Sequence, residues 1–206
     1  MFDKYVFPLV KTMEHSDLIT LKWRLFGVSE GQIAERLDAA LAGRACMTGY
    51  RLETPYLEFK VRCSPPEIPA IKTIIEPLVS SHIIASVEKR ASECLREHIM
   101  ALQVPIYIRD EVTGGVLQSL IQKPSNVAWL SFHEGDSSGL QFHISGLEDY
   151  WANRDTVHTR IRIDYDVQGQ AMSESHELPS RRVSIRHYVA EWLSFRLFHL
   201  INQLHQ

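Results

Sequence analysis

Three stretches of the chain alternate apolar and polar residues, as strands that bury one face do: 19–26, 56–63 and 157–167. After the first two stretches the apolar residues recur at helical spacing, and Ser29 with Gln32 forms a capping-box pattern at the start of the first helix. A last short strand is predicted at 82–85. The order strand, helix, strand, helix, strand predicts a small α+β domain over residues 18–86.

Residues 87–206 alternate between helical and strand patterns. The helices are predicted at 87–102, 113–122 and 181–204, and the strands begin at residues 106, 127, 140, 157 and 172. This order predicts an α/β sandwich domain with a mixed sheet, so the chain belongs to the α/β class. The last helix carries more aromatic residues than one buried stripe needs, which predicts either a second packing partner or a contact in a homodimer. These residues are Tyr188, Trp192, Phe195 and Phe198.

Composition and charge narrow the function. The chain has 206 residues with 22 Lys and Arg against 25 Asp and Glu, a near balance that argues against a nucleic-acid partner. No apolar run reaches membrane-spanning length, so no membrane partner is predicted. Cys46, Cys63 and Cys94 are widely spaced and odd in number, which predicts reduced thiols and a cytoplasmic location. The ten histidines show no ligand spacing, and we predict neither a metal site nor a cofactor.

One short stretch carries the candidate chemistry. From Ile106 the sequence predicts a short apolar strand, a tight polar corner and then a helix. The unpaired amides at the start of a helix favour anions, so Thr113, Gly114 and Gly115 are candidates for a phosphate or carboxylate cradle. An ordinary strand-to-helix turn explains the same two glycines equally simply.

Several motifs, taken in chain order, resemble the CinA family of competence/damage-inducible proteins, which are related to nicotinamide mononucleotide deamidases. The first is the block Leu25-Phe26-Gly27-Val28-Ser29-Glu30-Gly31-Gln32-Ile33-Ala34-Glu35-Arg36-Leu37, followed by Gly49-Tyr50-Arg51 and Pro55-Tyr56-Leu57-Glu58-Phe59-Lys60-Val61. These resemble the family's KH-like middle domain, although the Gly-x-x-Gly loop with which KH domains clamp nucleic acid is absent from the sequence. The corner 109–115 is similar to the family motif A-E-S-C-T-G-G, and residues 180–183 place basic residues where the family does. Residues 1–10 resemble the segment that links the family's upstream domain to the KH-like one, so residues 1–17 are predicted to be the remnant of a linker helix.

The resemblance implies a nucleotide site whose chemistry has been lost. The presumed nucleophilic serine of the family motif is replaced by Glu111, and a carboxylate is a poor substitute for an activated hydroxyl. Ser145 and Gly146 stand where the family has a second glycine loop, and acidic residues follow them. We therefore predict a non-catalytic structural, oligomerising or ligand-sensing module whose ligand is a pyridine nucleotide, held by Thr113, Gly114, Gly115, Ser145 and Gly146. The alternative is a residual nicotinamide mononucleotide amidohydrolase that uses Glu111.

Overall fold

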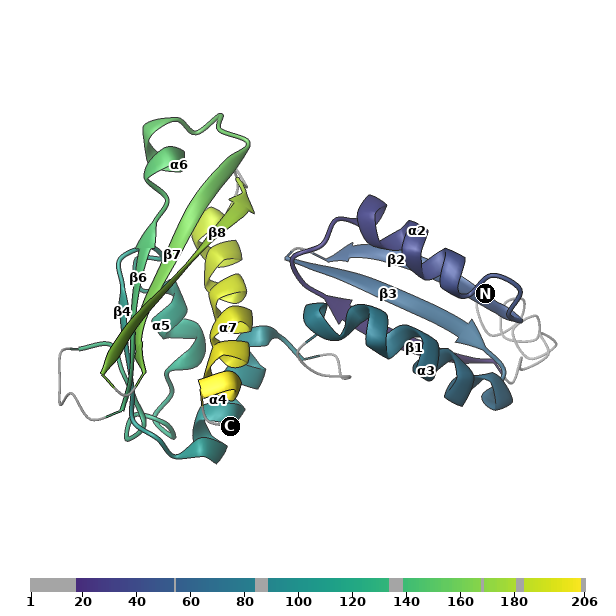
Figure 1. Ribbon diagram of the computed structural model, residues 1–206, viewed down its shortest axis with the longest axis horizontal. Coiled ribbons are helices and arrows are strands. Elements are labelled where there is room, and N and C mark those ends of the chain that lie inside the picture. Colours follow the sequence, from purple (N-terminus) through teal and green to yellow (C-terminus); the bar gives the residue numbers. More distant parts are fainter. Residues whose placement is uncertain are drawn as a thin grey trace, which may run out of the picture.

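The computed structural model describes residues 18–53, 55–83, 89–133, 139–167, 169–180 and 184–204. They form two units, each with its own sheet (Figure 1). The first unit comprises residues 18–83 and the second comprises residues 89–204. The mixed α/β class predicted from the sequence is confirmed, and one of the two sheets is the predicted mixed sheet.

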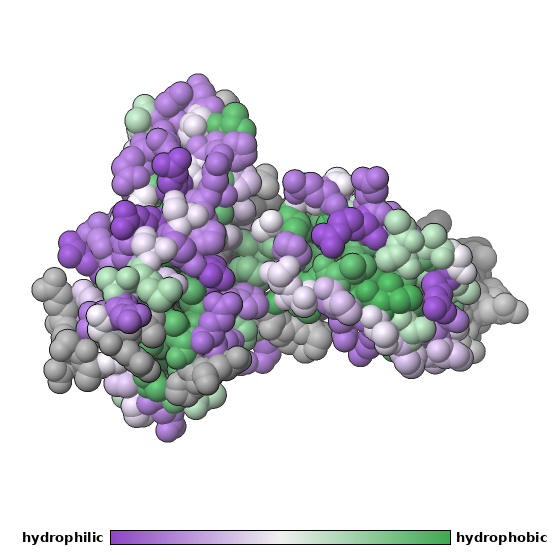
Figure 2. All heavy atoms as spheres, viewed as in Figure 1, coloured by the Kyte–Doolittle hydropathy of each residue, from purple (hydrophilic) through white to green (hydrophobic). Residues whose placement is uncertain are grey.

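The first unit is an antiparallel sheet with helices on one face. Its elements are β1 (Ile19–Leu25), α2 (Glu30–Ala40), β2 (Cys46–Glu53), β3 (Tyr56–Cys63), η2 (Pro65–Glu67), α3 (Ile68–Val79) and η3 (Ser80–His82), and the strand order is β1-β3-β2. The alternating residues of β1 and β3 place Trp23, Phe59 and Val61 in a core with Ile33 of α2 and Ile75 of α3. From the side seen in Figure 2, largely apolar side chains show between the two helices.

The second unit is a five-stranded sheet with three of its helices, at 91–102, 116–121 and 185–204, on the side that faces the first unit (Figure 1). Its elements are α4 (Ala91–Leu102), β4 (Ile106–Asp110), α5 (Val116–Ile121), β5 (Leu130–Ser131), β6 (Leu140–Gly146), α6 (Glu148–Ala152), β7 (His158–Val167), β8 (Gln170–Pro179) and α7 (Ile185–Leu204). The strand order is β5-β4-β6-β7-β8, with β4 parallel to both of its neighbours and β7 antiparallel to both of its own. Because α4, α5 and α7 cover a single face, the other face of the sheet carries the polar members of each alternating strand.

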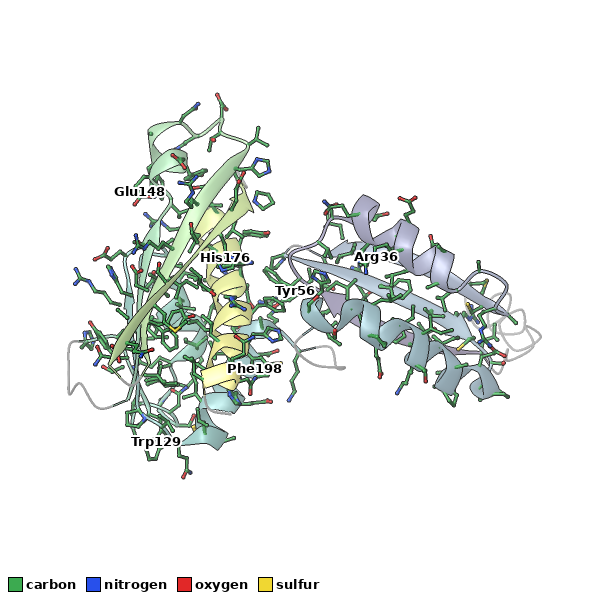
Figure 3. The ribbon with its side chains drawn as sticks, viewed as in Figure 1. Arg36, Tyr56, Trp129, Glu148, His176 and Phe198 are labelled. Atoms are coloured by element: carbon green, nitrogen blue, oxygen red, sulfur yellow. The ribbon has the colours of Figure 1, made fainter. Side chains whose placement is uncertain are left out.

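A buried polar network joins the two units. The Tyr56 hydroxyl donates to Oε2 of Glu191 at 2.8 Å, and Ser92 donates to the same carboxylate from its amide at 3.2 Å and its hydroxyl at 2.8 Å. Beside this network the ring of Phe26 stacks on Phe195 with 5.3 Å between centroids. Figure 3 shows Tyr56 between the units. Tyr188 and Phe195 of α7 therefore find a packing partner in Phe26 of the first unit, whereas Trp192 and Phe198 contact His176 and His98 within the second unit.

Several predicted boundaries are wrong. The first unit runs strand, helix, strand, strand, helix. The sequence pattern missed β2, an edge strand whose side chains are exposed or only half-buried and whose burial does not alternate. His82, predicted to begin a strand, belongs to η3, and residues 84–88 lie outside the described part of the chain. The strand predicted at 127–132 shrinks to two residues, because Asn126 caps a turn by accepting from the Lys123 amide. The predicted linker remnant 1–17 also lies outside the described residues.

No helix in the described part of the chain is both long enough and apolar enough to cross a membrane. All three cysteines are free thiols. Two of them, Cys46 and Cys63, are directly paired across β2 and β3 although 17 positions separate them in the sequence.

Candidate functional site

The predicted corner lies at the carboxyl end of β4, where parallel strands β4 and β6 finish together. Asp110 is the last residue of β4 paired with β6, and the next amide, that of Glu111, still donates to the carbonyl oxygen of Ile144 at 3.1 Å. Gly114 and Gly115 then adopt positive φ angles of 63° and 87°, which a residue with a Cβ rarely adopts. The glycine pair thus turns the chain from β4 into α5.

The carboxylate of Asp110 already occupies the backbone amides at the start of the corner. Oδ1 of Asp110 accepts from the amides of Val112 and Thr113, both at 2.9 Å, and Oδ2 accepts from the Thr113 hydroxyl. The same hydroxyl oxygen accepts from the Leu117 amide at 3.0 Å, and Thr113 is fully buried. The amide and the hydroxyl of Thr113, which were predicted to hold a ligand, are therefore already engaged in hydrogen bonds within the corner. The amides of Gly114 and Gly115 donate to no backbone acceptor among the described residues and lie at the surface.

Two arginines and a tryptophan lie beside the glycine pair. A Cβ built on Gly114 would lie 3.1 Å from Nη1 of Arg186, at the start of α7. The guanidinium carbon of Arg186 is 5.1 Å from the ring centroid of Trp151, and that of Arg154 is 5.8 Å from it. The indole is 46% exposed, which leaves it accessible to a ligand. This basic and aromatic group is what the corner offers to an anion.

Glu111 takes no part in that group. Its carboxylate lies 2.7 Å from Arg109 and 3.1 Å from Nε2 of His143, both of which stand on the sheet face that the helices leave uncovered. The contact with His143, supported by Arg109, lowers the pKa of Glu111. The side chain is therefore ionised at neutral pH, and it turns away from Gly114 and α7.

The second predicted loop is built around a backbone contact. Gly146 has φ 132°, and a Cβ there would lie 2.2 Å from the carbonyl oxygen of Arg160 on β7. Only glycine allows this close approach, so the fold alone explains why residue 146 is a glycine and no ligand is needed to explain it. Ser145 lies on the uncovered sheet face, opposite Arg162 in the register. The acidic pair that follows it, Glu148 and Asp149, is exposed on α6 (Figure 3 labels Glu148).

A groove of about 830 Å³ runs along the uncovered sheet face beside Glu111. Its walls combine apolar surface with charged side chains of both signs. They include Tyr107, Arg109, His143, Arg162, Asp164 and Ser173. Arg162 and Asp164 form an ion pair at 2.8 Å, so much of the charge in the groove is already balanced.

The structure thus separates the predicted site residues into two groups. Gly114 lies beside Arg186 of α7, with Gly115 next to it, whereas Glu111 contacts two residues that line the groove, Arg109 and His143. Ser145 lies on the same uncovered face, opposite Arg162. Arg186 is one of three basic residues at the start of the predicted helix 181–204, and the other two, Arg181 and Arg182, lie outside the described residues. Trp151 and Arg154 were missed, and the only sequence signal for them is an aromatic residue shortly before a basic one in a polar segment.

No group of three or more His, Cys, Asp or Glu side chains in the described residues is arranged to hold a metal ion. No family model matches the chain, and no curated protein matches its sequence.

Proposed function

We propose that this chain is a non-catalytic, CinA-like module that binds a pyridine nucleotide at the end of β4 without cleaving it. The observation that carries the proposal concerns Glu111, which stands where the resemblance implies a nucleophilic serine and whose side chain is engaged in ion pairs. Its carboxylate is bonded to Arg109 and His143. The one hydroxyl within residues 110–115, on Thr113, is fully buried. The corner therefore offers no activated nucleophile to a carboxamide.

The ligand is proposed to meet the exposed side of the corner. Its phosphate would accept from the free amides of Gly114 and Gly115 and from Arg186, and its ring would lie against Trp151. Glu111 faces the groove, which removes the like-charge repulsion that a carboxylate beside the phosphate would cause. The contacts of Arg186 and Arg154 with the indole support this placement.

Binding is tested by thermal unfolding of the full chain with nicotinamide mononucleotide, nicotinic acid mononucleotide and nicotinamide adenine dinucleotide. A ligand present at about one hundred times its Kd adds roughly 2.7 kcal/mol to the free energy of unfolding. We expect a mononucleotide to stabilise the protein and Arg186→Gln to abolish the shift. Arg36→Gln, an exposed arginine on α2 of the first unit (Figure 3), is the matched control and should keep it.

The amidohydrolase alternative has one observation in its favour, the 3.1 Å contact between Glu111 and His143 in an exposed groove. A carboxylate that orients an imidazole is a common arrangement for a general base. If ammonia is released from nicotinamide mononucleotide and Glu111→Gln stops the release, this alternative replaces the proposal. If no release is detected with the unmodified chain, the alternative is excluded.

The homodimer is likewise a proposal. The aromatic residues of α7 that suggested it have partners within the chain: Tyr188 and Phe195 contact Phe26, Trp192 contacts His176, and Phe198 contacts His98. They therefore no longer support it. What supports it is β8, a ten-residue strand at the edge of the sheet that pairs with β7 alone among the described strands. Long unpaired edges are common sites of strand addition between two copies of a chain. Light scattering coupled to size exclusion gives the mass directly.

A further inference from the structure

The groove on the uncovered face of the second unit's sheet is crossed by a row of polar residues. The register places Arg109 of β4 opposite His143 of β6, and His143 opposite Asp164 of β7. Asp164 is in turn paired with Ser173 of β8. Paired residues of neighbouring strands project from the same face, and all four residues line the groove. The row therefore brings a guanidinium, an imidazole, a carboxylate and a hydroxyl together on one surface.

The carboxylate of Glu111 occupies the Arg109 end of this row. Its Oε1 lies 2.7 Å from Nη2 of Arg109, and its Oε2 lies 3.1 Å from Nε2 of His143. One carboxylate thus bridges two groups that come from different strands. The three side chains are 55%, 43% and 40% exposed for Arg109, Glu111 and His143. Ion pairs between exposed side chains contribute little to stability, so another carboxylate can displace Glu111 at small cost.

The contact with Glu111 does not satisfy the imidazole of His143. Although the ring is partly exposed, Nε2 itself is buried, and Glu111 makes no hydrogen bond of good geometry with it. A buried polar atom without a hydrogen bond costs free energy, so such atoms in proteins usually have a partner. Arg109 and His143 therefore form a carboxylate site that its present occupant fits only in part.

The other acids of the groove have partners of their own. Asp164 is paired with Arg162 at 2.8 Å. Oδ1 of Asp166 accepts from a backbone amide in the turn that joins β7 to β8, also at 2.8 Å. Arg109, by contrast, is paired with Glu111. Displacing Glu111 frees one guanidinium, which suits a ligand with a single negative charge.

An apolar part of the groove lies beside the carboxylate site. Tyr107 precedes Arg109 by two positions on β4, so the two residues stand on the same face about 7 Å apart. Tyr165 and Met172 also line the groove, and Met172 is 47% exposed. An aromatic ring attached to the carboxylate of a ligand would lie against Tyr107. The volume of about 830 Å³ is in the range of small-molecule sites.

We infer that the groove binds an aromatic monocarboxylate, whose carboxylate displaces Glu111 from Arg109 and His143. Glu111 is then an internal occupant with which the ligand competes. A phosphate fits less well, because its second charge would stand near Asp164, directly opposite His143 in the register. The site is separate from the proposed nucleotide site, since Arg186 belongs to α7 on the other face of the sheet.

The test is a titration of the full chain with benzoate, followed by long-range proton–nitrogen NMR of the histidine rings. The resonances of His143 are those missing from His143→Gln. Benzamide, which has the same shape without the charge, is the matched control ligand. We expect benzoate to shift the His143 resonances until the site is saturated, and benzamide to leave them unmoved.

Replacements in the site give the second readout. Glu111→Gln keeps the shape of the side chain and removes the competing charge, so benzoate should bind about two- to fivefold more tightly. Arg109→Gln removes the cation and should weaken binding about tenfold or more. The matched control is Arg160→Gln, at an exposed arginine of β7 outside the groove, which should bind benzoate as the unmodified chain does. Arg186→Gln should do the same, which separates this inference from the proposed nucleotide site.

Four results would each overturn the inference. Benzoate could leave the His143 resonances unmoved, or benzamide could shift them equally. Phenyl phosphate, with its second charge, could bind more tightly than benzoate. Glu111→Gln could bind benzoate no better than the unmodified chain. The Arg109 and Glu111 side chains are exposed, so both variants should fold, and thermal unfolding checks this before each titration.

Discussion

Removing the buried carboxylate of Glu191 should uncouple the two units. Glu191 is fully buried and accepts three hydrogen bonds, from the Tyr56 hydroxyl and from the amide and hydroxyl of Ser92. Tyr56 in turn accepts from the Ala91 amide at 2.6 Å. The carboxylate thus ties β3 of the first unit to the start of α4 and to α7, which is where the two units meet.

The expected loss in the free energy of unfolding depends on which buried polar groups each replacement leaves without a hydrogen-bond partner. Glu191→Ala removes all three bonds and leaves the Tyr56 hydroxyl and the Ser92 amide buried without an acceptor, at about 1–3 kcal/mol each. Together with the lost side-chain volume, about 3–5 kcal/mol is expected. Glu191→Gln keeps the shape, and its NH₂ group can donate to the Ser92 hydroxyl, so about 1–2 kcal/mol is expected from the lost charge. Domain stabilities are roughly 5–15 kcal/mol, so the first loss is a large fraction of the total.

The assay is urea unfolding followed by circular dichroism, with the free energy of unfolding obtained by linear extrapolation. Glu177→Gln, at an exposed glutamate on β8, is the control and should change stability by less than about 0.5 kcal/mol. Tyr56→Phe combined with Glu191→Ala should cost less than the sum of the single replacements, because both remove the same bond. The reasoning is refuted if Glu191→Ala lies within about 1 kcal/mol of the unmodified chain, or if the glutamine variant is as unstable as the alanine variant.

Two further predictions concern titration and oxidation. Burial alone would raise the pKa of Glu174, but hydrogen bonds from Arg196 and His176 outweigh it and lower the pKa below 4.5. Glu174→Gln should therefore lower the free energy of unfolding by about 1–3 kcal/mol above pH 4.5, and this difference should vanish as the pH falls through the lowered pKa. Urea unfolding across that pH range measures the difference. A difference that does not change with pH would contradict the prediction. Cys46 and Cys63 face each other across β2 and β3, where paired Cα atoms lie about 5 Å apart, within the range of a disulfide. Mild oxidation with diamide should join Cys46 and Cys63 in a disulfide and leave buried Cys94 as a free thiol. Intact-mass measurement and peptide mapping would show this, and a disulfide that includes Cys94 would contradict the pairing.

The fold was predictable from sequence where one face of a strand is buried. β1, β3 and β7 alternate because the core takes every second residue, and their bounds agree with the sequence pattern within a residue or two. β2 has no such pattern, because it lies at a sheet edge with Met47 and Leu52 both more than half exposed. Alternation of apolar and polar residues reflects the burial of one strand face, so a strand without a well-buried face does not show this alternation.

The candidate site was predictable only in part, for a related reason. The sequence identifies a turn at Gly114 and Gly115 and an unusual residue at Glu111. It cannot tell which side of the sheet each side chain faces, nor that His143, 32 positions later, lies beside Glu111. That contact depends on β6 pairing with β4, which is a property of the tertiary fold.

Strand pairing decides which charged side chains share a surface. The cations of β1 and β3 were visible as the polar halves of two alternating patterns, but their joint effect depends on which strands are neighbours. Once β3 lies next to β1, Lys22 and Lys60 fall opposite each other on one face.

The most direct test of the central claim, binding without cleavage, is one proton NMR experiment on nicotinamide mononucleotide mixed with the full chain. Saturation transferred from the protein to the ligand reports binding, and the ring resonances of nicotinic acid mononucleotide report deamidation in the same sample. We predict saturation transfer to the nicotinamide ring, lost in Arg186→Gln, and no product resonances over a long incubation. Product that accumulates in proportion to protein would contradict the account, and so would the absence of any saturation transfer.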